Sequence, residues 1–310
     1  MPLEVFITPV IQVSGFGVNT PAEGAKSLNP LQFLMHPAQR LYARPSLYGF
    51  TFHLGHFVQP YSGLSTGDIK VFGLGADYQF KSIKLSAQRG IIQPRVPNNT
   101  FNFSNGSFRR TLSAVRVEGT APNKWRHGFS FAFVDDHVNS LEVLPMANNP
   151  EKSAVASWFA RYNQSKQTQY QFEIANSSWA PNVSATDTLN EFGGVGSFLL
   201  GNTNVLGGLG VSAKMFHNPE NYRIDSRLSW NSTNYRSLAY PFMLADILDV
   251  EVNPQFTAFD KRLNTNLVLS YKGNNFSGTY GSRLNIPILK LNSSMRITEQ
   301  AFVNLVYALN

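Results

Sequence analysis

The sequence contains no cysteine, which excludes disulfide scaffolds, cysteine-ligated zinc sites and thiol catalysis. Charged residues are also scarce, at 15% of the chain against roughly 25% in a typical soluble domain. Long apolar runs are missing as well. The stretch "YPFMLADIL" at 240–248 is far shorter than the about 18 residues that a transmembrane helix needs. The composition therefore favours neither a helical membrane protein nor a soluble domain with an ordinary charged surface.

Neutral polar and aromatic residues take the place of the missing charge. The 24 Phe and 12 Tyr help to raise the aromatic share to 13%, and the polar residues are mostly Gly, Asn, Ser and Thr. The net charge of +7 comes from single Lys and Arg residues scattered along the chain rather than from a basic run. Since nucleic-acid-binding proteins concentrate their basic residues in patches, we expect no nucleic-acid partner.

Apolar and polar residues alternate with a period of two over much of the chain. In "VFGLGADYQFKSIKLSAQR" at 71–89 the parity changes once, at Lys81-Ser82, as in two strands joined by a tight turn. Similar stretches occur at 125–134, 153–163, 168–176, 208–216, 222–230, 263–271 and 301–309, with weaker ones at 4–14, 46–58, 108–119, 192–201, 275–282 and 285–297. Many have the length of a tilted strand that crosses a bilayer, about 9–11 residues.

The connections between these stretches alternate between short and long. Short ones are expected at Lys81-Ser82, 121–124, 164–167, 202–204, Pro219-Glu220 and Gly273-Asn274. Longer ones are expected at about 94–108, 137–151, 178–190 and 231–253. Short turns at one end and long loops at the other are typical of outer-membrane barrels, with turns in the periplasm and loops outside the cell. A soluble β-sandwich also alternates, but its outward faces should carry more charge than these do.

Tryptophan and tyrosine often stand at the ends of the apolar faces, as in the aromatic girdles of membrane barrels. These residues are Tyr78, Trp125, Trp158, Tyr162, Tyr170, Tyr222, Trp230, Tyr271 and Tyr307. The predicted fold is all-β: a transmembrane antiparallel up-and-down β-barrel of about 14–16 strands. We expect one barrel domain spanning 1–310, with a short irregular or helical segment at 20–40.

A barrel of this size is too wide for side chains alone to fill, so its polar face should line a lumen. The charged residues at the predicted lumenal positions are Lys84, Arg116, Glu118, Arg126, Arg161, Glu173, Lys214, Arg223, Asp225 and Arg227. Seven of these ten are basic, which favours anions by the logic of charged rings in pores. Alternatively, Arg223, Asp225 and Arg227 neutralise one another along a single face of one strand.

Signals for catalysis or metal binding are weak. His53 and His56 are three residues apart, so on a strand their rings point to opposite faces and cannot share an ion. Asp135, Asp136 and His137 could bind Ca²⁺ or act as an acid–base group, but they also fit a solvated strand end. No G-x-S-x-G elbow accompanies the six histidines. We therefore expect no enzyme, no cofactor and no metal site, with 135–137 as the weak exception.

Four phrases carry a family resemblance: "RPSLYGFTFHLGHFVQPYS", "DIKVFGLGADYQFKSIKLSAQRGIIQ", "FVDDHVNSL" and "NYRSLAYPF". The residues within these phrases that match the family's motifs are Leu47-Tyr48-Gly49, Phe72-Gly73-Leu74-Gly75, Asp135-Asp136 with Asn139-Ser140, and Tyr235-Arg236-Ser237-Leu238. Across most of 40–245 the chain resembles outer-membrane β-barrel proteins of Bacteroidota.

The resemblance implies a location in the bacterial outer membrane, among lipid and lipopolysaccharide, rather than a reaction. Two functions stay open at this point. One is a porin-like passive channel for small, anionic solutes. The other is a non-enzymatic membrane subunit of a larger secretion, surface-export or assembly complex, with other envelope proteins as partners.

Overall fold

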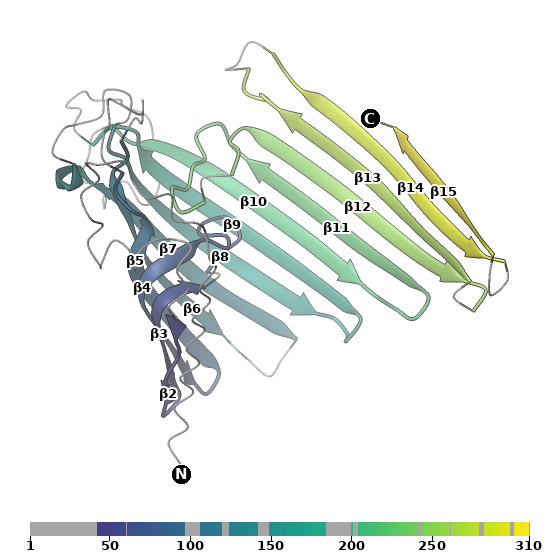
Figure 1. The fold of residues 1–310 in the computed structure, drawn as a ribbon, viewed down its shortest axis with the longest axis horizontal. Helices are drawn as coiled ribbons and strands as arrows, with labels where there is room; N and C mark the ends of the chain where they lie inside the picture. Colours follow the sequence, from purple (N-terminus) through teal and green to yellow (C-terminus); the bar gives the residue numbers. More distant parts are fainter. Residues whose placement is uncertain are drawn as a thin grey trace, which may run out of the picture.

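The structure, a computed structural model, describes residues 42–309 except 60, 97–105, 120–123, 142–148, 184–199, 201–203, 241–242, 261, 279–281 and 298–300. Fifteen strands from this part of the chain form one antiparallel sheet (Figure 1). They are β1 (Tyr42–Ala43), β2 (Ser46–Leu47), β3 (Phe50–Val58), β4 (Lys70–Phe80), β5 (Ile83–Gln93), β6 (Arg109–Gly119), β7 (Trp125–His137), β8 (Lys152–Asn163), β9 (Thr168–Ala180), β10 (Leu206–His217), β11 (Tyr222–Asn231), β12 (Ile247–Ala258), β13 (Leu263–Asn274), β14 (Asn285–Arg296) and β15 (Phe302–Leu309). A short 3-10 helix, η1 (Val138–Ser140), follows β7.

The sheet is a meander in which each strand from β4 to β14 pairs with its two neighbours in sequence. β1 lies at one edge, β15 lies at the other, and β2 pairs with β3 beside the main path. In Figure 1 the β3–β6 region is seen nearly edge-on while β11–β15 are seen face-on, so the sheet curves strongly across its width. The structure thus shows an all-β antiparallel sheet of 15 strands that is not closed into a barrel. None of the helices in the described ranges is long and apolar enough to cross a lipid bilayer.

The alternation of short and long connections is confirmed, although the short connections expected at 202–204 and Gly273-Asn274 were misplaced. Residues 202–204 fall within the long connection between β9 and β10, and the short turn near Gly273-Asn274 lies between β12 and β13. Short connections follow β4, β6, β8, β10, β12 and β14, and all lie at one end of the sheet. Long connections follow β3, β5, β7, β9, β11 and β13 at the opposite end. The 71–89 hairpin also has the predicted register: Phe80 pairs with Ile83, Tyr78 with Leu85, and Ala76 with Ala87. Lys81 makes the tight turn with a left-handed backbone (φ 47°).

Several predicted boundaries are wrong in the second half of the chain. The predicted loop at 231–253 contains the start of β12, whose Leu248 and Val250 alternate with Asp249 and Glu251. Pro254 lies within this strand without an N–H to donate, which weakens the strand signal. Gly273-Asn274 is not a turn, because both residues belong to β13.

The predicted strand at 275–282 is a loop where it is described. Asn275 and Gly278 have positive φ angles of 56° and 73°. The carboxylate of the buried Asp246 accepts hydrogen bonds from the N–H groups of Phe276 and Ser277 at 3.1 and 3.2 Å, which replaces strand pairing. The predicted strand at 192–201 does not separate β9 from β10, since these two strands pair directly. The stretches expected at 4–14 and 20–40 lie outside the described residues.

Burial on the two faces of the sheet is the reverse of that in a soluble sheet. On the polar face, Ser86, Gln88 and Ser130 are only 8%, 5% and 4% exposed. On the opposite, apolar face, Leu74 and Phe129 are 65% and 63% exposed. A soluble antiparallel sheet packs its apolar face on the core and turns its polar face to water. This sheet therefore presents its hydrophobic side outward.

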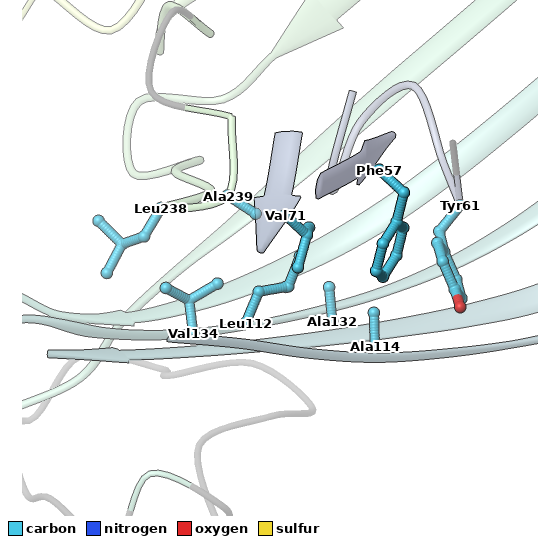
Figure 2. Close-up of a cluster of buried hydrophobic side chains, with 9 residues drawn as sticks. All are labelled: Phe57, Tyr61, Val71, Leu112, Ala114, Ala132, Val134, Leu238 and Ala239. Atoms are coloured by element: carbon cyan, nitrogen blue, oxygen red, sulfur yellow. The ribbon is translucent and has the colours of Figure 1, made fainter. Parts of the chain in front are cut away.

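Two long connections fold back over the polar face. Residues 61–69, between β3 and β4, and residues 232–240, between β11 and β12, form what we call the inner layer. Figure 2 shows where it packs: Leu112, Ala114, Ala132 and Val134 project from β6 and β7 toward Tyr61, Leu238 and Ala239 of the inner layer. Phe57 of β3 and Val71 of β4 complete this cluster. Apolar side chains on the long-loop half of the polar face thus form a core beneath the inner layer.

Candidate functional site

A hollow of about 970 Å³ lies between the inner layer and the polar face of the strands. Tyr61, Gly63 and Tyr240 of the inner layer line one side of it. Its charged lining residues are Asp68, Lys70, Arg116, Arg161, Glu173, Lys214, Arg227, Asp249 and Lys272. Six of these are basic and three acidic, and five are among the predicted lumenal residues: Arg116, Arg161, Glu173, Lys214 and Arg227. The polar face thus brings half of the predicted residues to one cavity.

Glu173 fastens the inner layer to the sheet. Its carboxylate accepts hydrogen bonds from the Ser62 hydroxyl and from the backbone N–H groups of Gly63 and Leu64, the latter two at 3.2 and 3.3 Å. Charge-assisted bonds of this kind are roughly twice as strong as neutral ones. Glu173 was predicted as a lumenal charge; it lines the hollow and also anchors the inner layer.

Tyr235 joins the two halves of the inner layer. Its hydroxyl donates to the carbonyl of Leu64 at 2.7 Å. Burial raises the pKa of Tyr235 well above its ordinary value, and the charge on Glu173 adds to the effect, so the phenol stays a neutral donor. The chain of Tyr235 lies directly on Gly208 and Gly210 of β10, where a Cβ atom at Gly208 would overlap its backbone N and Cα.

Arg116 is also occupied by the inner layer. It forms an ion pair with Glu118 at 2.7 Å and donates to the carbonyl of Tyr61 at 2.9 Å. Its guanidinium lies 4.1 Å from the centroid of the Phe159 ring. Arg116 and Glu118 therefore hold the segment after β3 in place, and their charges largely cancel.

An ion cluster that the sequence analysis missed lies at the long-loop end. Arg110 contacts Asp136 at 2.7 Å and Glu151 at 3.0 Å, and Glu151 also contacts Arg236 of the inner layer at 3.1 Å. Arg236 stacks on the Trp179 ring at 4.3 Å. These residues are distant in sequence, and only the strand register and the docking of the inner layer bring them together.

The weak candidate triad of Asp135, Asp136 and His137 is split between two environments. Asp136 belongs to the ion cluster, whereas Asp135 and His137 both contact the Thr111 hydroxyl, at 2.6 and 3.2 Å. No group of three His, Asp or Glu side chains within the described ranges is arranged to hold a metal ion. His53 bonds to Asp77 and Tyr42, and His56 lies 4.7 Å from the Phe72 ring, in separate surroundings.

The other predicted lumenal residues divide into paired and unpaired charges. Lys84 lies 3.5 Å from Asp77, and Arg223 pairs with Asp225 at 2.7 Å. Arg227 does not pair with Asp225, but instead contacts Asp249 and Glu251 at 3.2 and 3.3 Å. The remaining three of these predicted residues make no ion pair with any residue that the structure describes. They are Arg126, Arg161 and Lys214.

Aromatic rings gather on the apolar face at the short-turn end. Trp125 and Tyr162 stack at 4.5 Å, Tyr162 and Tyr170 at 6.3 Å, and Phe50 and Tyr78 at 4.2 Å. Tyr222 continues this band on β11. Of the remaining predicted girdle residues, Trp230 and Tyr271 lie near the long-loop end, while Trp158 and Tyr307 lie within β8 and β15.

Replacing Glu173 with glutamine should loosen the inner layer. One amide oxygen cannot serve three donors as a carboxylate does, so we expect a loss of about 1 kcal/mol in the free energy of unfolding. Glu220→Gln, which removes the same negative charge from an exposed residue in the turn between β10 and β11, is the control for the change of charge. Denaturant titration of the refolded protein measures both. Equal stability of E173Q and the wild type would contradict the anchoring role.

Comparisons with known proteins assign no function to this chain. No protein-family model matches the sequence, and no match is found among curated proteins. A function therefore has to be argued from the two faces of the sheet, the hollow and the inner layer.

Proposed function

We propose that this chain forms a β-barrel of the bacterial outer membrane and acts as a non-enzymatic, passive channel for small anions. The observation that carries the proposal is the reversed burial: side chains such as Leu74 and Phe129 are exposed while Ser86 and Gln88 are covered. Exposed apolar surface on this scale is unfavourable in water, at roughly 25 cal/mol per Å². In a bilayer the same face would contact lipid acyl chains.

Strand lengths and the aromatic band support a position across the bilayer. The long strands β3–β15 have 8 to 13 residues, against about 9–11 for tilted transmembrane strands. The aromatic band would mark the periplasmic interface, because it lies at the short-turn end. The long connections would then face the outside of the cell, and lipid and lipopolysaccharide would surround the barrel.

The proposal requires the sheet to close in the membrane. An unpaired edge would leave backbone N–H and C=O groups in hydrocarbon, at a cost of several kcal/mol for each group. Because every pair from β3 to β15 is antiparallel, β3 and β15 run in the same direction. An antiparallel seam would therefore join β15 to β1 or to the strand expected at 4–14 rather than to β3.

The excess of basic residues in the hollow supports a preference for anions. The test is a planar bilayer recording with the refolded protein under a tenfold KCl gradient. We expect discrete channels whose reversal potential has the sign of chloride permeation and shifts toward zero in the Lys214→Glu variant. Lys290→Glu, on the polar face of β14 away from the hollow, serves as control. Insertion without channels, or a cation preference, would refute the proposed channel.

A second candidate function is favoured by the inner layer. Since residues 61–69 and 232–240 cover much of the polar face, the barrel could instead be the filled membrane subunit of a larger secretion, surface-export or assembly complex. The resemblance to envelope barrels of Bacteroidota fits both functions. Purification from native membranes separates them: stable association with other envelope proteins would support the subunit, and a lone monomer would support the channel.

A further inference from the structure

Four basic residues stand in one row across the polar face, which we call the basic row. Arg126 of β7 is the direct partner of Arg161 of β8, and Arg161 is the partner of Gln171 of β9. Gln171 is in turn the partner of Lys214 of β10, and Lys214 is the partner of Arg227 of β11. Five adjacent strands thus place four cations and one amide at the same level.

Such a row is unfavourable unless something neutralises it, because like charges on directly opposite residues destabilise a sheet. At its end, Arg227 is neutralised by Asp249 and Glu251. The carboxylates of adjacent rows are engaged elsewhere, Glu173 with the inner layer and Asp225 with Arg223. Arg161 and Lys214 make no ion pair with the described residues, and both line the hollow.

We propose that Arg161 and Lys214, on either side of Gln171, bind the phosphate group of a small solute. This inference rests on the proposed channel and names the class of anion that it would take. The two residues are separated by one strand, so their backbones lie about 9–10 Å apart. Side chains as long as those of Arg and Lys can converge on one group across that span.

The three side chains supply the donors that a phosphate group accepts. A guanidinium can bind two oxygens side by side, and an ammonium adds a compact charge with three donors. Gln171 uses one amide N–H for Gln169, at 3.2 Å, which leaves its second N–H for a ligand. A spherical chloride ion would use fewer of these donors than a tetrahedral dianion. The position on the polar face, within the hollow, fits a dissolved phosphate rather than a lipid headgroup.

Binding is tested by calorimetric titration of the refolded, full-length protein in detergent with inorganic phosphate and with pyrophosphate. Arg161→Gln and Lys214→Gln should each weaken binding roughly tenfold or more, since each removes a charge-assisted contact. The double variant should not bind measurably. Lys290→Gln removes one positive charge from the same face outside the row and should leave the affinity unchanged. Arg161→Lys keeps the positive charge but loses the planar guanidinium that can bind two oxygens side by side. It should therefore bind phosphate more tightly than Arg161→Gln and less tightly than the wild type.

A stability measurement separates a binding role from a structural one. If the row is kept for binding, Arg161→Gln relieves like-charge repulsion and should not lower the free energy of unfolding in phosphate-free buffer. Wild-type protein that fails to bind phosphate, or a double variant that binds as well as the wild type, would overturn the inference. Succinate binding as tightly as phosphate would also overturn it, in favour of a general carboxylate site.

The outcome of the phosphate-binding experiment can be told apart from the outcome of the bilayer recordings. Phosphate binding in detergent without channels in bilayers would refute the channel and leave the site intact. Anion-selective channels without phosphate binding would refute the site and leave the channel intact.

Discussion

Val115→Arg should strongly destabilise the folded protein in lipid bilayers. Val115 lies near the middle of β6 on the apolar face and is 50% exposed. At the midplane of a bilayer, an arginine on the lipid face of a barrel costs about 2–4 kcal/mol. On the surface of a soluble sheet, a change at an exposed valine would stay within about 0.5 kcal/mol. Denaturant titration of the protein refolded into short-chain lipid vesicles measures the difference.

Asn264→Arg is the matched control, since it introduces the same residue into the polar face of β13, where Asn264 is exposed. We expect this variant to insert like the wild type. If V115R and N264R behaved alike, the apolar face would not contact lipid, and the membrane proposal would fail. A soluble, monodisperse wild-type protein without detergent would lead to the same conclusion.

Gly208→Ala should release residues 232–240 from the sheet. The added Cβ would overlap the backbone of Tyr235, and a backbone clash cannot be relieved by a change of rotamer. Overpacking of this kind costs about 1–3 kcal/mol. The undocked segment would expose the peptide bond after Arg236, so limited trypsin digestion with mass spectrometry should show a new cleavage there.

Gly119→Ala is the control for this change. A Cβ at Gly119 would be 3.5 Å from its nearest neighbour, the carbonyl of His127, which is ordinary contact. We expect wild-type protection of Arg236 in this variant. Protection in Gly208→Ala as well would show that the inner layer does not depend on the close approach to β10.

The sequence alone predicts the local pairing of strands well. The hairpin of β4 and β5 has a strict period of two and a tight turn, so its register follows from the pattern of apolar residues. The order of short and long connections could also be predicted, because it depends only on where alternation stops. The reversed faces follow from the scarcity of charge at the polar positions.

Features that depend on distant residues could not be predicted. The first part of β12 falls in the predicted loop at 231–253, and Pro254, which has no N–H to donate, weakens the strand signal there. Residues 61–69 and 232–240 have the composition of ordinary connections, and nothing local shows that they fold over the polar face. The pairing of Arg227 with Asp249 and Glu251, rather than with Asp225, required the position of β12.

The basic row could not be predicted either, because it too depends on residues that are distant in sequence. Arg161, Gln171 and Lys214 align only because β9 pairs directly with β10 across the long connection at 181–205. A strand inserted at 192–201, as the alternation suggested, would have separated Lys214 from Gln171. The period of two places each of these basic residues on the polar face. Their alignment in one row across neighbouring strands could not be predicted without the strand register.

The contact between Leu64 and Tyr235 has a consequence for the order of assembly. Neighbouring strands of the meander form hairpins through contacts that are local in sequence, and these close quickly. The hydrogen bond from Tyr235 to Leu64 joins residues 171 positions apart, so the entropy of a very long loop opposes it until the intervening strands are in place. The two halves of the inner layer are therefore joined on the polar face only after β4 to β11 have assembled.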